Sequence, residues 1–85
     1  MRRLGTVLHI TPSRNFIVKL EFTPEHDLRG TKVVDEEMTL LGVVKDIIGP
    51  VSAPLLVVGC SRDITSPENF KGKVVYLIEE GDLPY

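Results

Sequence analysis

Apolar residues recur at every second position in several segments of this chain, a period typical of β-strands, whose successive side chains point to opposite faces. The clearest case is the segment 16–22, where one face is formed by Phe16, Val18, Leu20 and Phe22. Residues 4–10 alternate in the same way, and a polar turn at 11–15 separates the two segments. We therefore expect an antiparallel strand pair that ends at Pro24, because proline has no N–H to donate to a neighbouring strand.

The rest of the chain predicts four more strands. They are the short apolar segment 32–34, the long apolar segment 40–48, the nearly continuous apolar segment 55–60, which should be buried on both faces, and the alternating segment 74–79. Gly42 indicates a bulge or sharp bend within the long strand. Residues 35–37 read as a solvated acidic turn. In the polar segment 62–72, Ser66 is expected to cap one helical turn that starts at Pro67.

Six short strands without a long helix favour a closed structure over an open sheet, which would leave edges and one apolar face uncovered. A sandwich is the alternative to a barrel. The composition agrees with strands, since 11 Val, 6 Ile and 10 Leu accompany a single Ala. We predict an all-β fold, a small closed six-stranded antiparallel barrel formed by residues 1–80, with a loose tail at 81–85.

The charge balance argues against tight, autonomous binding of nucleic acid. Ten Lys and Arg residues face twelve Asp and Glu, a net charge of −2, whereas nucleic-acid binders usually carry a basic surplus. Basic residues do fall near the predicted strand ends and would gather on one rim of a barrel; they are Arg2, Arg3, Arg14, Lys32, Lys71 and Lys73. Because no set of stacking aromatics accompanies them, ordinary solvated charge is the favoured interpretation.

Neither a membrane span nor a secretory signal is expected. No apolar run approaches the roughly 20 residues of a membrane helix, and the first three residues lead into strand-like alternation. The single cysteine, Cys60, rules out an internal disulfide and favours a reducing compartment, so we expect a cytoplasmic protein.

The sequence offers no catalytic set. His9, His26 and Cys60 cannot complete a closed zinc site without distant carboxylates, and no histidine lies near Cys60 in the sequence to activate it, so Cys60 is expected to be a small buried hydrophobe. The acidic runs 35–37 and 79–80 lack the spacing of a calcium loop, and the glycines form no phosphate-binding pattern. We expect no enzymatic activity, no cofactor and no metal.

The segment 42–54 carries the strongest binding signal. Ile47 and Ile48 are adjacent and precede the rigid corner Gly49-Pro50. Because neighbouring strand residues point to opposite faces, one isoleucine should lie outside the barrel, where an exposed apolar residue beside a fixed turn indicates protein docking. The alternative is a two-sided strand covered by a loop.

Three segments resemble the Gar-type core subunit of archaeal H/ACA ribonucleoproteins, which are RNA-guided pseudouridine synthases. They are Arg-Leu-Gly-Thr-Val-Leu-His at 3–9, Leu-Gly-Val-Val-Lys-Asp-Ile-Ile-Gly-Pro-Val at 41–51 with Pro54 after it, and Gly-Lys-Val-Val-Tyr at 72–76. The central segment is the most specific. Ile48 and Leu55 stand where relatives often have aromatic residues, and no Gly/Arg-rich tail is present.

This resemblance implies a barrel of the translation-factor and reductase type. It also implies a non-catalytic accessory subunit that binds the dyskerin-like pseudouridine synthase directly and aids substrate RNA loading and release during rRNA pseudouridylation. Guide RNA, substrate rRNA and the other H/ACA proteins would be reached through the complex. The implied docking residues are Ile47, Ile48, Gly49, Pro50, Val51 and Pro54. Two alternatives are a stand-alone small-barrel RNA-binding or ribosome-maturation module, and a related assembly factor with the same barrel.

Overall fold

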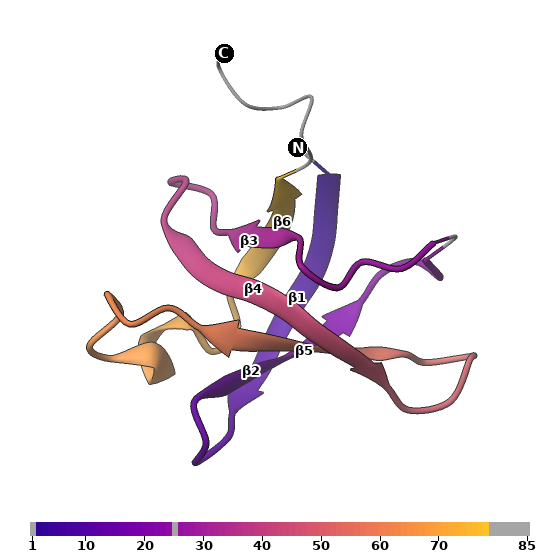
Figure 1. Cartoon of the computed structure of the whole chain (residues 1–85), viewed down its shortest axis with the longest axis horizontal. Helices are drawn as coiled ribbons and strands as arrows, with labels where there is room; N and C mark the ends of the chain where they lie inside the picture. The colour runs from indigo at the N-terminus through magenta and orange to yellow at the C-terminus, as the bar shows by residue number, and fades with distance from the viewer. Residues whose placement is uncertain (1, 25, 79–85) are drawn as a thin grey trace.

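Strands follow one another along almost the whole chain in the computed structural model, which describes residues 2–24 and 26–78. The elements are β1 (Arg2–Ile10), β2 (Asn15–Leu20), β3 (Lys32–Val34), β4 (Leu40–Ile48), β5 (Leu55–Cys60), the 3-10 helix η1 (Pro67–Phe70) and β6 (Val74–Ile78). They close into a barrel in the order β1-β2-β5-β4-β3-β6, with every pair antiparallel (Figure 1). The predicted closed six-stranded antiparallel barrel is confirmed. Residues 79–80 and the expected tail 81–85 lie outside the described residues.

The core lies inside the barrel and is made by the inward face of each strand. Its fully buried side chains include Leu4, Phe16, Val18, Val33, Leu41, Leu56, Val58, Val75 and Leu77. Phe16 is the largest of them, and its ring meets that of Phe70 edge to face, with 5.8 Å between centroids. Helix η1 therefore covers one opening of the barrel with an aromatic side chain.

Glycine allows β4 to approach its neighbour β5 closely. A Cβ at Gly42 would overlap the carbonyl oxygen of Gly59, so any larger residue there would push the two backbones apart. The register between β3 and β4 shifts between Val33 and Val34, which pair with Gly42 and Leu40. The predicted irregularity in the long strand is thus confirmed as a bulge next to Gly42.

Several local predictions were wrong. The strand that begins at Asn15 ends at Leu20, so Phe22 lies beyond it, half-buried beneath the guanidinium of Arg2 at 3.8 Å. In β5 only Leu56 and Val58 are fully buried, because a barrel strand keeps its other face toward the outside. Helix η1 does start at Pro67, but the side chain of Ser66 makes no capping hydrogen bond.

The acidic turn between β3 and β4 also differs from the expectation. Asp35 is buried, at 5% exposed, and its carboxylate accepts hydrogen bonds from the backbone N–H groups of Glu37 and Thr39, both at 2.9 Å. This carboxylate closes the tight turn in which Met38 adopts a left-handed backbone, at φ 66°. Asp35 therefore acts as a structural residue, whereas Glu36 and Glu37 remain exposed.

Candidate functional site

An open, mainly apolar groove of about 400 Å³ lies where the β4–β5 loop meets the connection between β2 and β3. We call it the docking groove. Its lining from the β4–β5 side is Ile47, Gly49, Pro50, Val51 and Pro54, and its lining from the β2–β3 side is Thr23, Pro24 and His26. Figure 1 shows the two loops at the right-hand side of the barrel.

A bulge in β4 decides which isoleucine faces outward. The register between β4 and β5 shifts between Val44 and Asp46, so the alternation of inward and outward side chains reverses beyond that point. The Asp46 carboxylate accepts a hydrogen bond from the N–H of Ile47 at 2.8 Å. Ile47 consequently packs against the core, and Ile48 points outward with 42% of its surface exposed. One of the pair lies outside the barrel, as the pattern predicted.

The β4–β5 loop holds its apolar residues in a fixed shape. Gly49 has a left-handed backbone, at φ 88°, and the N–H of Ala53 donates to the carbonyl of Pro50 at 3.0 Å to close the turn. At the tip of this loop, Val51 is 83% exposed. Such exposure of a valine on a closed turn gives the groove an apolar edge that nothing in the described chain covers.

The structure thus brings five of the six predicted docking residues to one groove. The sixth, Ile48, lies on the adjoining outer surface and is not part of the groove lining. Sequence reasoning did not assign Thr23, Pro24 and His26 to a binding site. No local signal could have found them, because only barrel closure brings the β2–β3 connection beside the β4–β5 loop.

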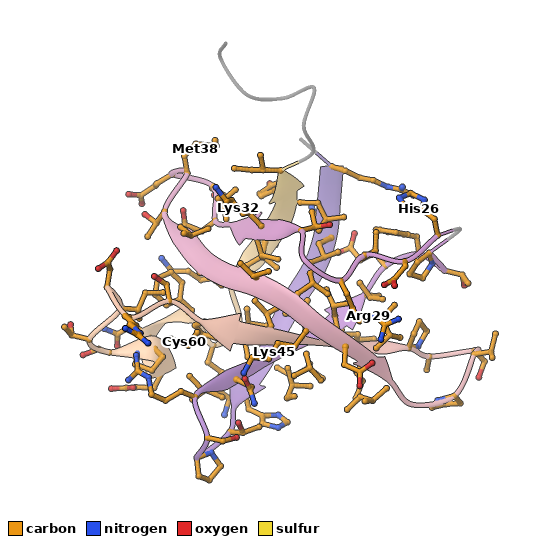
Figure 2. All side chains as sticks on the ribbon, viewed as in Figure 1. His26, Arg29, Lys32, Met38, Lys45 and Cys60 are labelled. Atoms are coloured by element: carbon orange, nitrogen blue, oxygen red, sulfur yellow. The ribbon has the colours of Figure 1, made fainter. Side chains whose placement is uncertain are left out.

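Charged residues beside the docking groove pair with each other. Asp27 and Arg29 form an exposed ion pair at 2.9 Å on the β2–β3 connection, and His26 and Arg29 are labelled there in Figure 2. Hydrogen bonds from the Arg29 side chain, and then from its backbone N–H, hold the pKa of Asp27 at about 2, below the usual 3.8. The same partner raises the pKa of Arg29. Near neutral pH this pair therefore adds no net charge.

Replacing Arg29 with glutamine should return the pKa of Asp27 toward 3.8, because the guanidinium is the main cause of the shift. A carboxyl-carbon NMR titration measures this directly. Since the folded-state pKa is lowered, the contribution of this group to stability is complete above about pH 3.8 and is lost as the pH falls toward 2. Arg62→Gln is the control and should leave Asp27 unchanged. An ordinary pKa for Asp27 in the unaltered chain would contradict the assignment.

The other candidate residues do not converge. Within residues 2–24 and 26–78, no group of three His, Cys, Asp or Glu side chains comes together in a way that would hold a metal ion. His9 is exposed on β1. Cys60 is half-buried rather than buried, because it lies at the end of β5, and the Nη2 atom of Arg14 lies 3.4 Å from its sulfur. In this same part of the chain, no helix has the length and apolarity needed to cross a membrane.

A single basic rim, the less favoured interpretation of the sequence, does not form from the basic residues near the strand ends. Arg3 pairs with Glu21 at 2.9 Å, and Arg2 stacks on Phe22 near the same end of β1. Arg14 instead lies at the β1–β2 turn and donates to the carbonyl of Ile64 at 2.7 Å. Lys73 lies 5.4 Å from the ring centre of Phe70.

Comparison with solved structures gives an informative likeness. The sequence matches no protein-family model and no curated protein. Among solved structures, the Gar1 domain of NAf1 superposes with a TM-score of 0.72 at 16% identity, over 92% of this chain and 85% of that one. At this identity the likeness shows the fold alone: the chain has a Gar1-like barrel.

Proposed function

We propose that this chain is a non-catalytic accessory subunit of a cytoplasmic, archaeal H/ACA-type ribonucleoprotein, and that its docking groove binds the dyskerin-like pseudouridine synthase. One observation supports this most: five residues of the groove lining, Ile47, Gly49, Pro50, Val51 and Pro54, belong to the most specific part of the sequence resemblance to the Gar-type subunit. The Gar1-like barrel supports the same proposal.

The physical properties of the groove suit a protein partner. An apolar surface gains free energy when a complementary surface excludes water from it. Pro50 and Pro54 restrict the backbone of the loop, so little conformational entropy is lost when the partner binds. With a net charge of −2, the chain is better suited to hold another protein than to hold RNA directly.

Binding to the synthase tests the proposal. The unaltered chain should co-elute with the purified synthase, and Val51→Asp should weaken the affinity at least about tenfold, ~1.4 kcal/mol, because the new carboxylate would be buried unpaired. Ile48→Asp should weaken it as well if the adjoining outer surface belongs to the interface. Val51 is 83% exposed in the free chain, so its replacement should not disturb folding.

Met38→Asp is the matched control, because Met38 is 52% exposed and lies on the β3–β4 turn, away from the docking groove (Figure 2). It should bind as the unaltered chain does. Absence of co-elution, or equal losses in both variants, would contradict the docking assignment. The proposed aid to RNA loading and release predicts that Val51→Asp also slows multiple-turnover pseudouridylation more than the single-turnover reaction.

A further inference from the structure

A second open groove, of about 670 Å³, lies on the outer surface of the β4–β5 pair, toward the β1–β2 turn. We call it the cationic groove, and the residues that define it here are Arg14, Leu40, Val43, Lys45, Cys60 and Arg62. In Figure 2, Cys60 lies to the left of the centre and Lys45 near the centre, whereas Arg29 and His26 lie to the right. The cationic groove is lined from the start of β4 and the end of β5, and the docking groove from the end of β4 and the loop that leads to β5. The cationic groove and the docking groove therefore occupy opposite ends of the same strand pair.

One of the cations in this groove, Arg14, is held in place by hydrogen bonds, and a second, Lys45, lies across a glycine. Arg14 has a left-handed backbone, at φ 63°, and its guanidinium donates to the Ile64 carbonyl at 2.7 Å. The Lys45 side chain lies across Gly59, because a Cβ at that glycine would come within 2.6 Å of the Lys45 Cε atom. Positioned side chains lose less conformational entropy on binding than free ones.

No ion pair within the described residues neutralises the positive charge of the groove. In the part of the chain that the structure describes, the carboxylate ion pairs join Arg3 to Glu21 and Arg29 to Asp27, and none involves Arg14, Lys45 or Arg62. Among the described residues, three cations without a carboxylate ion pair thus surround one concave surface, in a chain whose overall charge is −2. A ligand for this surface should be negatively charged.

The floor of the groove favours an acidic peptide over a nucleic acid as the ligand. Leu40 and Val43 are 38% and 39% exposed there, an apolar surface that a sugar-phosphate backbone does not match. None of the described residues that line the groove is aromatic, so they offer unpaired bases no stacking surface. An extended peptide, in contrast, presents alternate side chains on opposite faces and can supply both carboxylates and apolar groups.

We propose that the cationic groove binds an extended acidic peptide segment, whose carboxylates contact Arg14, Lys45 and Arg62 and whose apolar side chains cover Leu40 and Val43. This binding site is separate from the docking groove, so the chain is able to hold two protein surfaces at once. The chain would then connect the partner bound in the docking groove to an acidic segment, which belongs either to that partner or to another protein.

The test is a fluorescence-anisotropy titration of the full chain with a short labelled peptide in which pairs of Glu alternate with pairs of Leu, so that each face of the extended peptide carries both residue types. Binding should be measurable at low salt and should weaken as the salt concentration rises past ~0.15 M. The double variant Lys45→Gln, Arg62→Gln should weaken it by about tenfold, since each exposed ion pair contributes modestly. Lys32→Gln, which removes an exposed cation from β3, should leave the affinity unchanged.

Two further probes identify the ligand. A peptide in which Ser replaces Glu tests the charge, and an oligouridylate of similar length tests the nucleic-acid alternative. The proposal is supported if the acidic peptide alone binds and the double variant loses it. It is overturned if the acidic peptide does not bind, if the double variant binds as well as the unaltered chain, or if the oligouridylate binds equally well.

Discussion

Replacing Gly42 with alanine will destabilise the barrel by at least about 3 kcal/mol. The added methyl group would overlap the carbonyl oxygen of Gly59, and backbone atoms cannot rotate out of the way as a side chain can. The strands β4 and β5 would have to separate along the pair that carries both grooves. The free energy of unfolding, measured by urea denaturation, checks this prediction.

Gly59→Ala is the matched control, because Gly59 lies on β5 opposite Val43 and its new methyl group would meet only the Lys45 side chain. A flexible lysine can move away, so the expected loss is within about 1 kcal/mol. Similar unfolding energies for Gly42→Ala and the unaltered chain would show that the close approach of the two strands does not constrain this position.

Phe16→Ala should destabilise the chain by about 3–5 kcal/mol. Phe16 is the largest fully buried side chain, and its removal would leave a cavity in the centre of the barrel. The edge-to-face contact with Phe70 would be lost as well, which is worth about 1 kcal/mol beyond the buried area. Helix η1 would then lose its main aromatic contact with the core.

Phe22→Ala serves for comparison, since Phe22 is half-buried and lies beyond the end of β2. Its replacement should cost clearly less than that of Phe16, by the same denaturation measurement. Phe22 packs against the core from beyond the end of β2, as the alternating pattern predicted. Equal losses at the two positions would therefore contradict the expectation that full burial of Phe16 contributes more than partial burial of Phe22.

The strands could be predicted from the sequence because alternation with a period of two is a local property. The ends of the strands were harder to predict. Phe22 continues the apolar pattern of β2, but the strand ends at Leu20, where the chain enters the β2–β3 connection. Asp35 was misread for a related reason. Its carboxylate is buried because it accepts backbone hydrogen bonds within its own turn, which the composition of an acidic run does not indicate.

Only part of the docking groove could be predicted from the sequence. The Gly49-Pro50 corner marked the loop, and adjacency required one of the two isoleucines to face outward. Simple alternation from Val44 would have turned Ile48 inward, and a bulge of one residue reversed that outcome. The contribution of Pro24 and His26 depends on contacts between segments far apart in the chain, which a linear pattern does not encode.

The bulge between Val44 and Asp46 also divides β4 into two parts with different surface chemistry. Before it, Val43 faces outward and, with the bulged residue Lys45, contributes to the cationic groove; after it, Ile48 faces outward beside the docking groove. A regular strand would carry a single register from end to end. Removal of one residue at this point would exchange the inward and outward faces of the second part while leaving the first part intact. The identity of the docking surface is therefore more sensitive to a change in chain length here than to most single substitutions.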